Sequence, residues 1–217
     1  MQTQIFKMAI LVFAALILIP AVPGMAAEKV IKLPKPQMDG GMPLMKALSE
    51  RHSTREFSEK KLSEQVLSNL LWAGFGINRP DTGGRTAPSP VNVQDISIYV
   101  ALEQGFYLYD AKANELKLVV DKDLRADTGK QPFVGKAPLN LVYVSDYSKF
   151  EKFKGMEDAW SGVDCGAIVQ NVYLYCASEG LNVVVRGMLD REALAKKIGL
   201  KANEKILLAQ TVGYPGK

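Results

Sequence analysis

The sequence has few of the residues that bind metal ions or form disulfides. Its 217 residues include one histidine and two cysteines, Cys165 and Cys176, and no CxxC motif. Structural zinc sites usually need four cysteine or histidine ligands, so we expect no metal site. Both cysteines lie in one predicted helix, where eleven residues separate them by about 16 Å, too far for a disulfide. We therefore expect two reduced, buried thiols.

A strong excess of charge of one sign is also missing. The chain has 27 lysines and arginines against 23 aspartates and glutamates, which gives a net charge of +4, and the two signs are interleaved. Proteins that bind nucleic acid usually gather basic residues on one face, so we expect no nucleic-acid partner. The hydrophobic fraction of 47% is typical of a globular protein, and the length suits a single domain.

No apolar run is long enough to cross a membrane. The longest, Met8 to Ile19, has about 12 residues, whereas a spanning helix needs about 20. A polar start with Lys7 precedes it, and Gly24 and Ala26 suit the −3 and −1 positions of a cleavage site. This pattern predicts a signal peptide over residues 1–27, with an uncleaved anchor as the alternative. We expect an exported protein, periplasmic or secreted, that has no membrane contact after cleavage.

The remainder predicts an extended N-terminal arm over residues 28–42 and one domain over residues 43–217. The arm is rich in proline, lysine and glycine, which favours an extended segment over a packed element. Apolar spacing predicts helices near 44–48 and over 63–76, 163–180 and 191–199, with Ser63 and Asp190 as N-caps and Gly180 as a C-terminal glycine. Branched and aromatic runs predict strands over 96–102, 105–111, 115–120, 139–146, 181–189 and 205–215. The order of these elements predicts an α+β fold.

Three short segments have side chains that suit a polar ligand. In "RHSTREF", Arg51, Ser53 and Arg55 would share one face of an extended segment and could grip a phosphate. "APSPVNVQ" combines stiff prolines with hydroxyl and amide groups. In "VVVRGM", a glycine after a branched strand permits close approach of a ligand. Taken alone, each segment also has an explanation without a ligand. The first could be a charged surface loop, the second a polar turn and the third a strand of the core.

Taken in order, "RHSTREF", "APSPVNVQ", "GAIVQN", "GLNVVVRG" and "VGYP" resemble the nitroreductase family of FMN-dependent oxidoreductases. "LLWAGFGINRP" and "RTAPSP" are especially similar to its short, thiazole-oxidase-like branch. The resemblance implies a sandwich of helices around a mostly antiparallel sheet, in an intertwined homodimer with FMN at the interface. It also implies the cofactor-binding residues: Arg51, His52, Ser53, Arg55, Pro88, Ser89, Pro90, Asn92, Val184, Val185, Arg186 and Gly187.

By this resemblance, Arg51, His52, Ser53 and Arg55 would hold the FMN phosphate, ribityl chain and pyrimidine edge. The proline-rich loop would approach the same flavin from the partner subunit, and the strand ending in Gly187 would lie near the ring. FMN chemistry requires no side-chain nucleophile, so no strictly catalytic residue is expected. The expected function is passage of a hydride or two electrons to or from a small organic substrate of nitro, quinone or heterocycle type.

Several alternatives stay open at this stage. A flavin-binding protein of the same fold without turnover, or a secreted module with a generic anion site, would share these residues. The electron donor is unknown, with NAD(P)H a candidate that export would make scarce. Many members of the family also place basic residues after the last strand to reach the phosphate, and Lys217 is the single candidate here. The substrate is not identified by these motifs.

Overall fold

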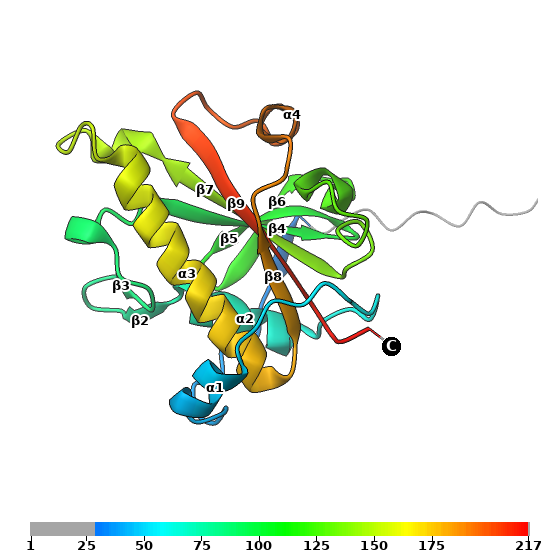
Figure 1. Cartoon of the computed structure of the whole chain (residues 1–217). Helices are drawn as coiled ribbons and strands as arrows, with labels where there is room; N and C mark the ends of the chain where they lie inside the picture. The colour runs from blue at the N-terminus through cyan, green and yellow to red at the C-terminus, as the bar shows by residue number, and fades with distance from the viewer. Residues whose placement is uncertain (1–28, 217) are drawn as a thin grey trace, which may run out of the picture.

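The structure is a computed structural model that describes residues 29–216 (Figure 1). The predicted signal peptide and Lys217 lie outside the described residues. A seven-stranded sheet forms the centre, in the order β1-β6-β5-β4-β7-β9-β8, and all its neighbouring strands run antiparallel. Its strands are β1 (Val30–Lys32), β4 (Ile96–Leu102), β5 (Gly105–Asp110), β6 (Glu115–Val120), β7 (Leu139–Asp146), β8 (Asn182–Arg186) and β9 (Glu204–Gly213). A small hairpin joins β2 (Ile77–Arg79) to β3 (Gly84–Arg85).

Four α-helices surround the sheet, and local sequence explains where they begin and end. They are α1 (Leu44–Glu50), α2 (Glu64–Phe75), α3 (Glu157–Glu179) and α4 (Arg191–Ile198). Ser63 and Asp190 cap α2 and α4 by accepting backbone N–H groups of Val66 and Ala193. Gly180 ends α3 at φ 65°, a left-handed conformation that glycine adopts without steric cost. Short 3-10 turns, η1 (Pro90–Asn92), η2 (Arg125–Thr128) and η3 (Tyr147–Phe150), lie in the connections.

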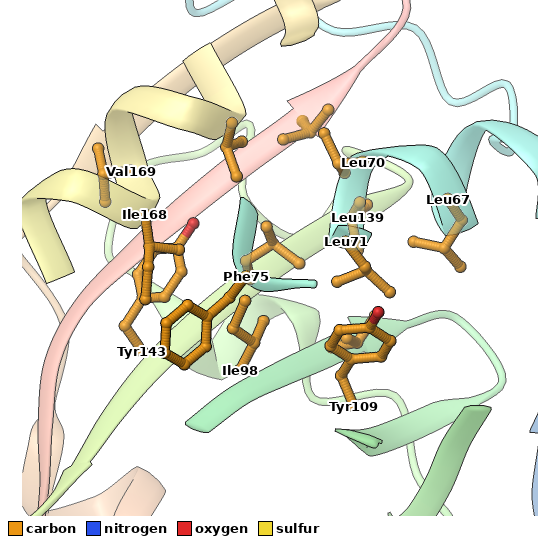
Figure 2. Packing of buried hydrophobic residues seen from close by; sticks show 14 of the residues in the cluster. Leu67, Leu70, Leu71, Phe75, Ile98, Tyr109, Leu139, Tyr143, Ile168 and Val169 are labelled. Carbon is orange, nitrogen blue, oxygen red and sulfur yellow. The ribbon is translucent and has the colours of Figure 1, made fainter. Parts of the chain in front are cut away.

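The sheet is buried on both faces. Helices α2 and α3 cover one face, where Leu71 and Phe75 of α2 and Ile168 of α3 pack on Ile98 and Tyr143 of the sheet (Figure 2). Helix α4 and the segment before η2 cover the other face, through Leu194, Ile198 and Leu124. Strand β7 lies between β4 and β9, and seven of its eight residues are buried, which explains its continuous apolar sequence.

The architecture confirms the predicted α+β class and the mostly antiparallel sheet. Strands β4, β6 and β7 begin and end where the alternation predicted, and both cysteines are free and buried. Two elements differ from the expectation. Part of the N-terminal arm is packed, because Val30–Lys32 pairs with β6 as an edge strand. Helix α3 begins at Glu157, six residues earlier than predicted, because polar residues fill its first turns on the solvent side.

Helix α3 is buried on one side only. Cys165, Ile168 and Val172 on its inner side are buried against the sheet, but Gly162, Val163 and Gly166 on its outer side are exposed. The apolar outer side therefore has no cover within one described chain. Among residues 29–216, no helix combines the length and hydrophobicity needed to span a membrane.

Candidate functional site

The "RHSTREF" segment lies against strand β8, although about 130 residues separate the two in sequence. Thr54 donates its backbone N–H to the carbonyl of Val183 at 2.9 Å, and Val183 donates its own N–H to Thr54 Oγ1 at 3.0 Å. Further along, Asn182 donates to the carbonyl of Glu56 at 2.6 Å. Strand β8 is the edge of the sheet, so this segment occupies backbone groups that would otherwise be unpaired.

Tyr173 of α3 joins the same two segments through its hydroxyl. Its oxygen lies 2.8 Å from Ser53 Oγ and accepts the backbone N–H of Val185 at 2.9 Å. The guanidinium of Arg51 lies over the Tyr173 ring, 5.2 Å from its centroid. Arg51 and Ser53 therefore face the same side chain, as the alternation predicted, and the helix fixes both against β8.

The charged groups of this segment remain available. Arg51 is partly exposed and Arg55 is exposed, and within residues 29–216 neither forms an ion pair. The exposed His52 places Nδ1 2.6 Å from the carbonyl oxygen of Glu50, which orients the ring at the end of α1. Two guanidiniums and a hydroxyl on one short, anchored segment can bind an anion by charge-assisted hydrogen bonds.

The strand residues predicted to lie near a ligand divide between the two faces of the sheet. Val185 packs against the α3 side and is partly exposed, while Val184 is buried. Arg186 points into the interior, where it donates to Thr128 O, Asn140 Oδ1 and Thr211 Oγ1 at 2.7 to 2.9 Å. Burial lowers the pKa of Arg186 to about 10. Its guanidinium thus fixes the fold, and any ligand contact here would come from the backbone of Arg186 and Gly187.

The "APSPVNVQ" loop lies elsewhere, beside the first half of α3. Ser89 Oγ accepts the backbone N–H of Gln94 at 2.8 Å, and the Gln94 side chain donates to Asn92 Oδ1 at 2.8 Å. Arg85 and Lys149 donate to the side-chain and main-chain oxygens of Gln94. These bonds close the loop on itself and leave Pro88 and Asn92 exposed.

The backbone of this loop is strained. Val91, Asn92 and Gln94 have φ values of 45°, 58° and 50°, in the left-handed region that residues with a side chain avoid. Such residues cost about 1 kcal/mol or more each, and they persist only where the surroundings enforce them. Strain of this kind is common at ligand-binding sites, so the loop is the second candidate segment.

One chain does not bring the two candidate segments together. Ser53 contacts Tyr173, whereas Ser89 interacts with Asp164, nine residues earlier on α3 and about 14 Å away along the helix axis. The hollow beside His52 and Tyr173 has a volume of only about 20 Å³. Ligand pockets usually measure about 300 Å³ or more, so a cofactor at this segment would need another wall. Larger hollows, of about 610 and 690 Å³, lie around Trp72 and are lined by none of the three motifs.

Sequence reasoning missed Tyr173, Asp95 and Asp164. Tyr173 carries no motif of its own, and only the folded chain shows that it joins the first and third segments. Asp164 did give a signal, because it is an acidic residue on the inner side of an apolar helix and is 1% exposed. Burial is the largest cause that raises its pKa to about 7, followed by its interaction with Asp95. Among residues 29–216, no cluster of three or more histidine, cysteine, aspartate or glutamate side chains could hold a metal ion.

Known proteins resemble this chain over most of its length. The profile of the nitroreductase family matches residues 48–214. One relative is a Methanocaldococcus jannaschii protein that is named as a proposed nitroreductase. It is 30% identical over 181 residues, which cover 76% of this chain and 88% of the relative. A crystal structure from Ralstonia eutropha, also described as a proposed nitroreductase, is 46% identical with a TM-score of 0.84, covering 88% of this chain and 91% of the other.

The fold also matches a more distant flavin enzyme. The NADPH:FMN oxidoreductase of Vibrio harveyi, solved with NAD+, has a TM-score of 0.60 at 21% identity and covers 80% of this chain and 69% of its own. At this identity the likeness concerns the fold alone. The family match and the more similar relatives support an oxidoreductase of the nitroreductase type. Because the profile spans α2 to α4, strands β4 to β9 of the sheet and all three candidate segments, this chain belongs to the nitroreductase family.

Proposed function

We propose that this protein is an FMN-dependent oxidoreductase that works as a homodimer, with each flavin held between two subunits. In this proposal Arg51, Ser53 and Arg55 of one subunit hold the phosphate and the polar part of the flavin. The loop with Pro88, Ser89, Pro90 and Asn92 comes from the partner. The backbone of β8 near Val185 and Gly187 lies beside the ring.

The observation that carries this proposal is the joined surface of "RHSTREF" and β8. The guanidinium of Arg51, the Ser53 hydroxyl and the edge of β8 are held together through Thr54 and Tyr173, and the exposed Arg55 lies two residues after Ser53 on the same segment. Donors of this type suit a phosphate and an electron-rich ring, because Tyr173 already holds Arg51 and Ser53, so that of the three side chains only Arg55 has to be ordered on binding. The chemistry of the donor set therefore fits FMN.

The exposed apolar surface supports the dimer. Leu44, Met45 and Leu48 of α1 are 62, 76 and 42% exposed, and Val163 on the outer side of α3 is 58% exposed. Helix α1 packs near the C-terminal end of α3, where Met42 donates its N–H to Ser178 Oγ (Figure 1). The three exposed side chains grouped on α1 are of the kind that marks interaction surfaces, and Val163 lies nearer the other end of α3. A second copy covering them would also bring its own loop toward the first subunit's arginines.

When bound, FMN would supply transfer of a hydride or two electrons through N5 of the ring. The residues of this chain would bind and orient it. Arg55 is the best placed to stabilise negative charge on the ring, because it is exposed and unpaired within the described residues. We propose small nitro, quinone or heterocyclic compounds as the substrate class. We further propose that the protein is exported, so that its electron donor need not be NAD(P)H.

The test is the flavin content and spectrum of the purified mature protein, with binding measured by fluorescence quenching. We expect a yellow protein whose bound flavin is reduced anaerobically and reoxidised by a nitroaromatic or a quinone. Replacing Arg51 and Arg55 by alanine should weaken FMN binding by at least about 100-fold, since each charge-assisted contact is worth about 1.5 to 3 kcal/mol. The control is the double variant Lys122→Ala and Lys152→Ala, which removes two exposed charges elsewhere.

Three outcomes separate the alternatives. Binding with reduction and reoxidation supports the oxidoreductase. Binding without any turnover supports a flavin-binding protein of the same fold. No binding by the wild-type protein at excess FMN, or unchanged binding by the double arginine variant, contradicts the proposed site.

A further inference from the structure

Two buried carboxyl groups lie directly behind the strained loop. Asp95 follows Gln94 at the end of the loop and is fully buried, and Asp164 of α3 is 1% exposed. Within the described residues, Asp95 Oδ1 and both oxygens of Asp164 lack a partner with good hydrogen-bond geometry, and the Ser89 hydroxyl interacts with Asp164 without such geometry. A buried carboxylate without donors is strongly unfavourable, so this arrangement indicates a missing proton.

The side chains around the pair favour a single shared proton. Ser145 donates to Asp95 Oδ2, and the Ser161 hydroxyl lies 2.9 Å from that of Ser145. Ser145 therefore supplies a donor to one oxygen of Asp95 and leaves Oδ1 without one. The two carboxyl groups interact directly, and a proton on Asp164 would turn one unpartnered oxygen into a donor for Asp95 Oδ1.

The pair is connected to both ends of the loop. Ser89 at its start interacts with Asp164, and its hydroxyl also accepts the N–H of Gln94. Asp95 at its end belongs to the pair, and its carbonyl accepts the N–H of Asp146 from β7. A second negative charge between these two anchors would repel Asp95, which directly follows Gln94 in the chain.

We propose that Asp164 is a positioning residue: it carries a proton, donates it to Asp95, and so holds the loop in the strained conformation that presents Ser89 and Asn92. The effect on flavin binding rests on the proposed function, whereas the effect on the loop does not. The pKa of Asp164 lies at about 7, so its protonated form predominates below neutral pH and its ionised form above it. We therefore infer that the loop loosens as the pH rises above neutrality.

The other groups near the pair do not change charge in this range. Burial raises the pKa of the Cys165 thiol to about 12. Burial and the bond to Asp158 raise the pKa of the Tyr147 hydroxyl to about 12. Arg85 and Lys149 contact the loop through the side-chain and main-chain oxygens of Gln94.

The first test measures the loop alone, without flavin. Amide hydrogen exchange of Gln94, corrected for intrinsic exchange, reports the bond to Ser89 in the full chain. We expect its protection to fall at least about fivefold between pH 6 and pH 8.5, since one released proton can shift such an equilibrium up to about tenfold per pH unit. Asp164→Asn, which keeps a donor and no charge, should show constant protection. The exposed Asp121→Asn is the control and should follow the wild type.

A second measurement identifies the proton. The infrared difference spectrum between wild type and Asp164→Asn at pH 6 should contain the band of a protonated carboxyl, and the band should be lost above neutral pH. This measurement, together with the wild-type exchange profile, stays informative if Asp164→Asn folds poorly. FMN affinity, measured in parallel, should weaken with pH in the wild type and stay level in Asp164→Asn.

Several results would overturn the inference. These are a wild-type Gln94 protection that does not change with pH, the same pH profile in Asp164→Asn, or no protonated carboxyl band. Thermal stabilisation by Mg²⁺ or Ca²⁺ that is lost in Asp164→Asn would show that a cation, not a proton, occupies the pair. If FMN does not bind at any pH while the exchange results hold, the proposed function fails and the positioning role of Asp164 stands.

Discussion

At the scale of single residues, Tyr173 has the clearest role. Its hydroxyl contacts Ser53 and the N–H of Val185, two groups that lie 132 residues apart in sequence. We expect Tyr173→Phe to lower the free energy of unfolding by about 1 to 2 kcal/mol, because both groups lose their partner. Urea denaturation measures this loss. FMN titration should show weaker binding as well, if the surface it fixes is the flavin site.

The matched control for Tyr173 is Tyr175→Phe. Tyr175 lies on the same helix and its hydroxyl donates a longer bond of 3.4 Å to the carbonyl of Val66. We expect a smaller loss of stability and unchanged FMN binding. Equal effects of the two variants on FMN binding would show that Tyr173 has no special connection to the site.

Asp164 gives a prediction about stability and pH. Its pKa rises from 3.8 in the unfolded chain to about 7 in the fold, so the folded state binds more protons between these values. Stability from this group is therefore complete below about pH 4 and is lost as the pH rises through about 7. Asp164→Asn should be more stable than wild type by about 2 to 4 kcal/mol at pH 8 and similar to it at pH 4.

Thermal or urea unfolding across this pH range tests the prediction for Asp164. The exposed Asp121→Asn should track the wild type throughout. A stability difference that is independent of pH would mean that the carboxyl is ionised in the fold at all pH values tested.

At the scale of elements, local sequence decided most boundaries. Ser63 and Asp190 cap α2 and α4, and runs of branched and aromatic residues define β4 and β7, because these signals depend on neighbours within one turn or one strand. The pairing of Val30–Lys32 with β6 could not be predicted in this way. It depends on a partner 85 residues away and on an edge that only the assembled sheet exposes.

The N-cap of α2 can be tested alone. Ser63 accepts the N–H of Val66 at 3.3 Å, and Ser63→Ala should lower stability by about 1 kcal/mol. Ser63→Asp should restore most of the loss, since aspartate is an equally good N-cap and its charge favours a helix N-terminus. Circular dichroism during urea unfolding measures both variants. Equal losses in the alanine and aspartate variants would assign the effect to packing.

At the scale of the whole molecule, the proposed site requires two copies of the chain. The two polar segments lie about 14 Å apart along α3, and the apolar outer surface of α1 and α3 is exposed in one chain. Met45→Glu should therefore shift the protein toward the monomer in light scattering, because it places a charge at the centre of the proposed contact.

The control for Met45 is Val119→Glu on β6, which is 36% exposed and far from α1. It should leave both assembly and flavin binding unchanged. FMN should be lost from Met45→Glu together with the dimer. A monomer that keeps its flavin would contradict a site shared between subunits, and a wild-type monomer would contradict the dimer itself.

The sequence by itself determined the fold class, the strand pattern, the helix caps and the absence of a disulfide, because these depend on composition and on spacing over a few residues. It also contained the three polar segments that resemble the family. Only the tertiary structure decided which of them meet. Strand order places β8 at the sheet edge beside Thr54, and one tyrosine joins them. Likewise, the buried pair of Asp95 and Asp164 exists only because the loop and α3 pack together, and contacts between distant segments leave no local periodicity to detect.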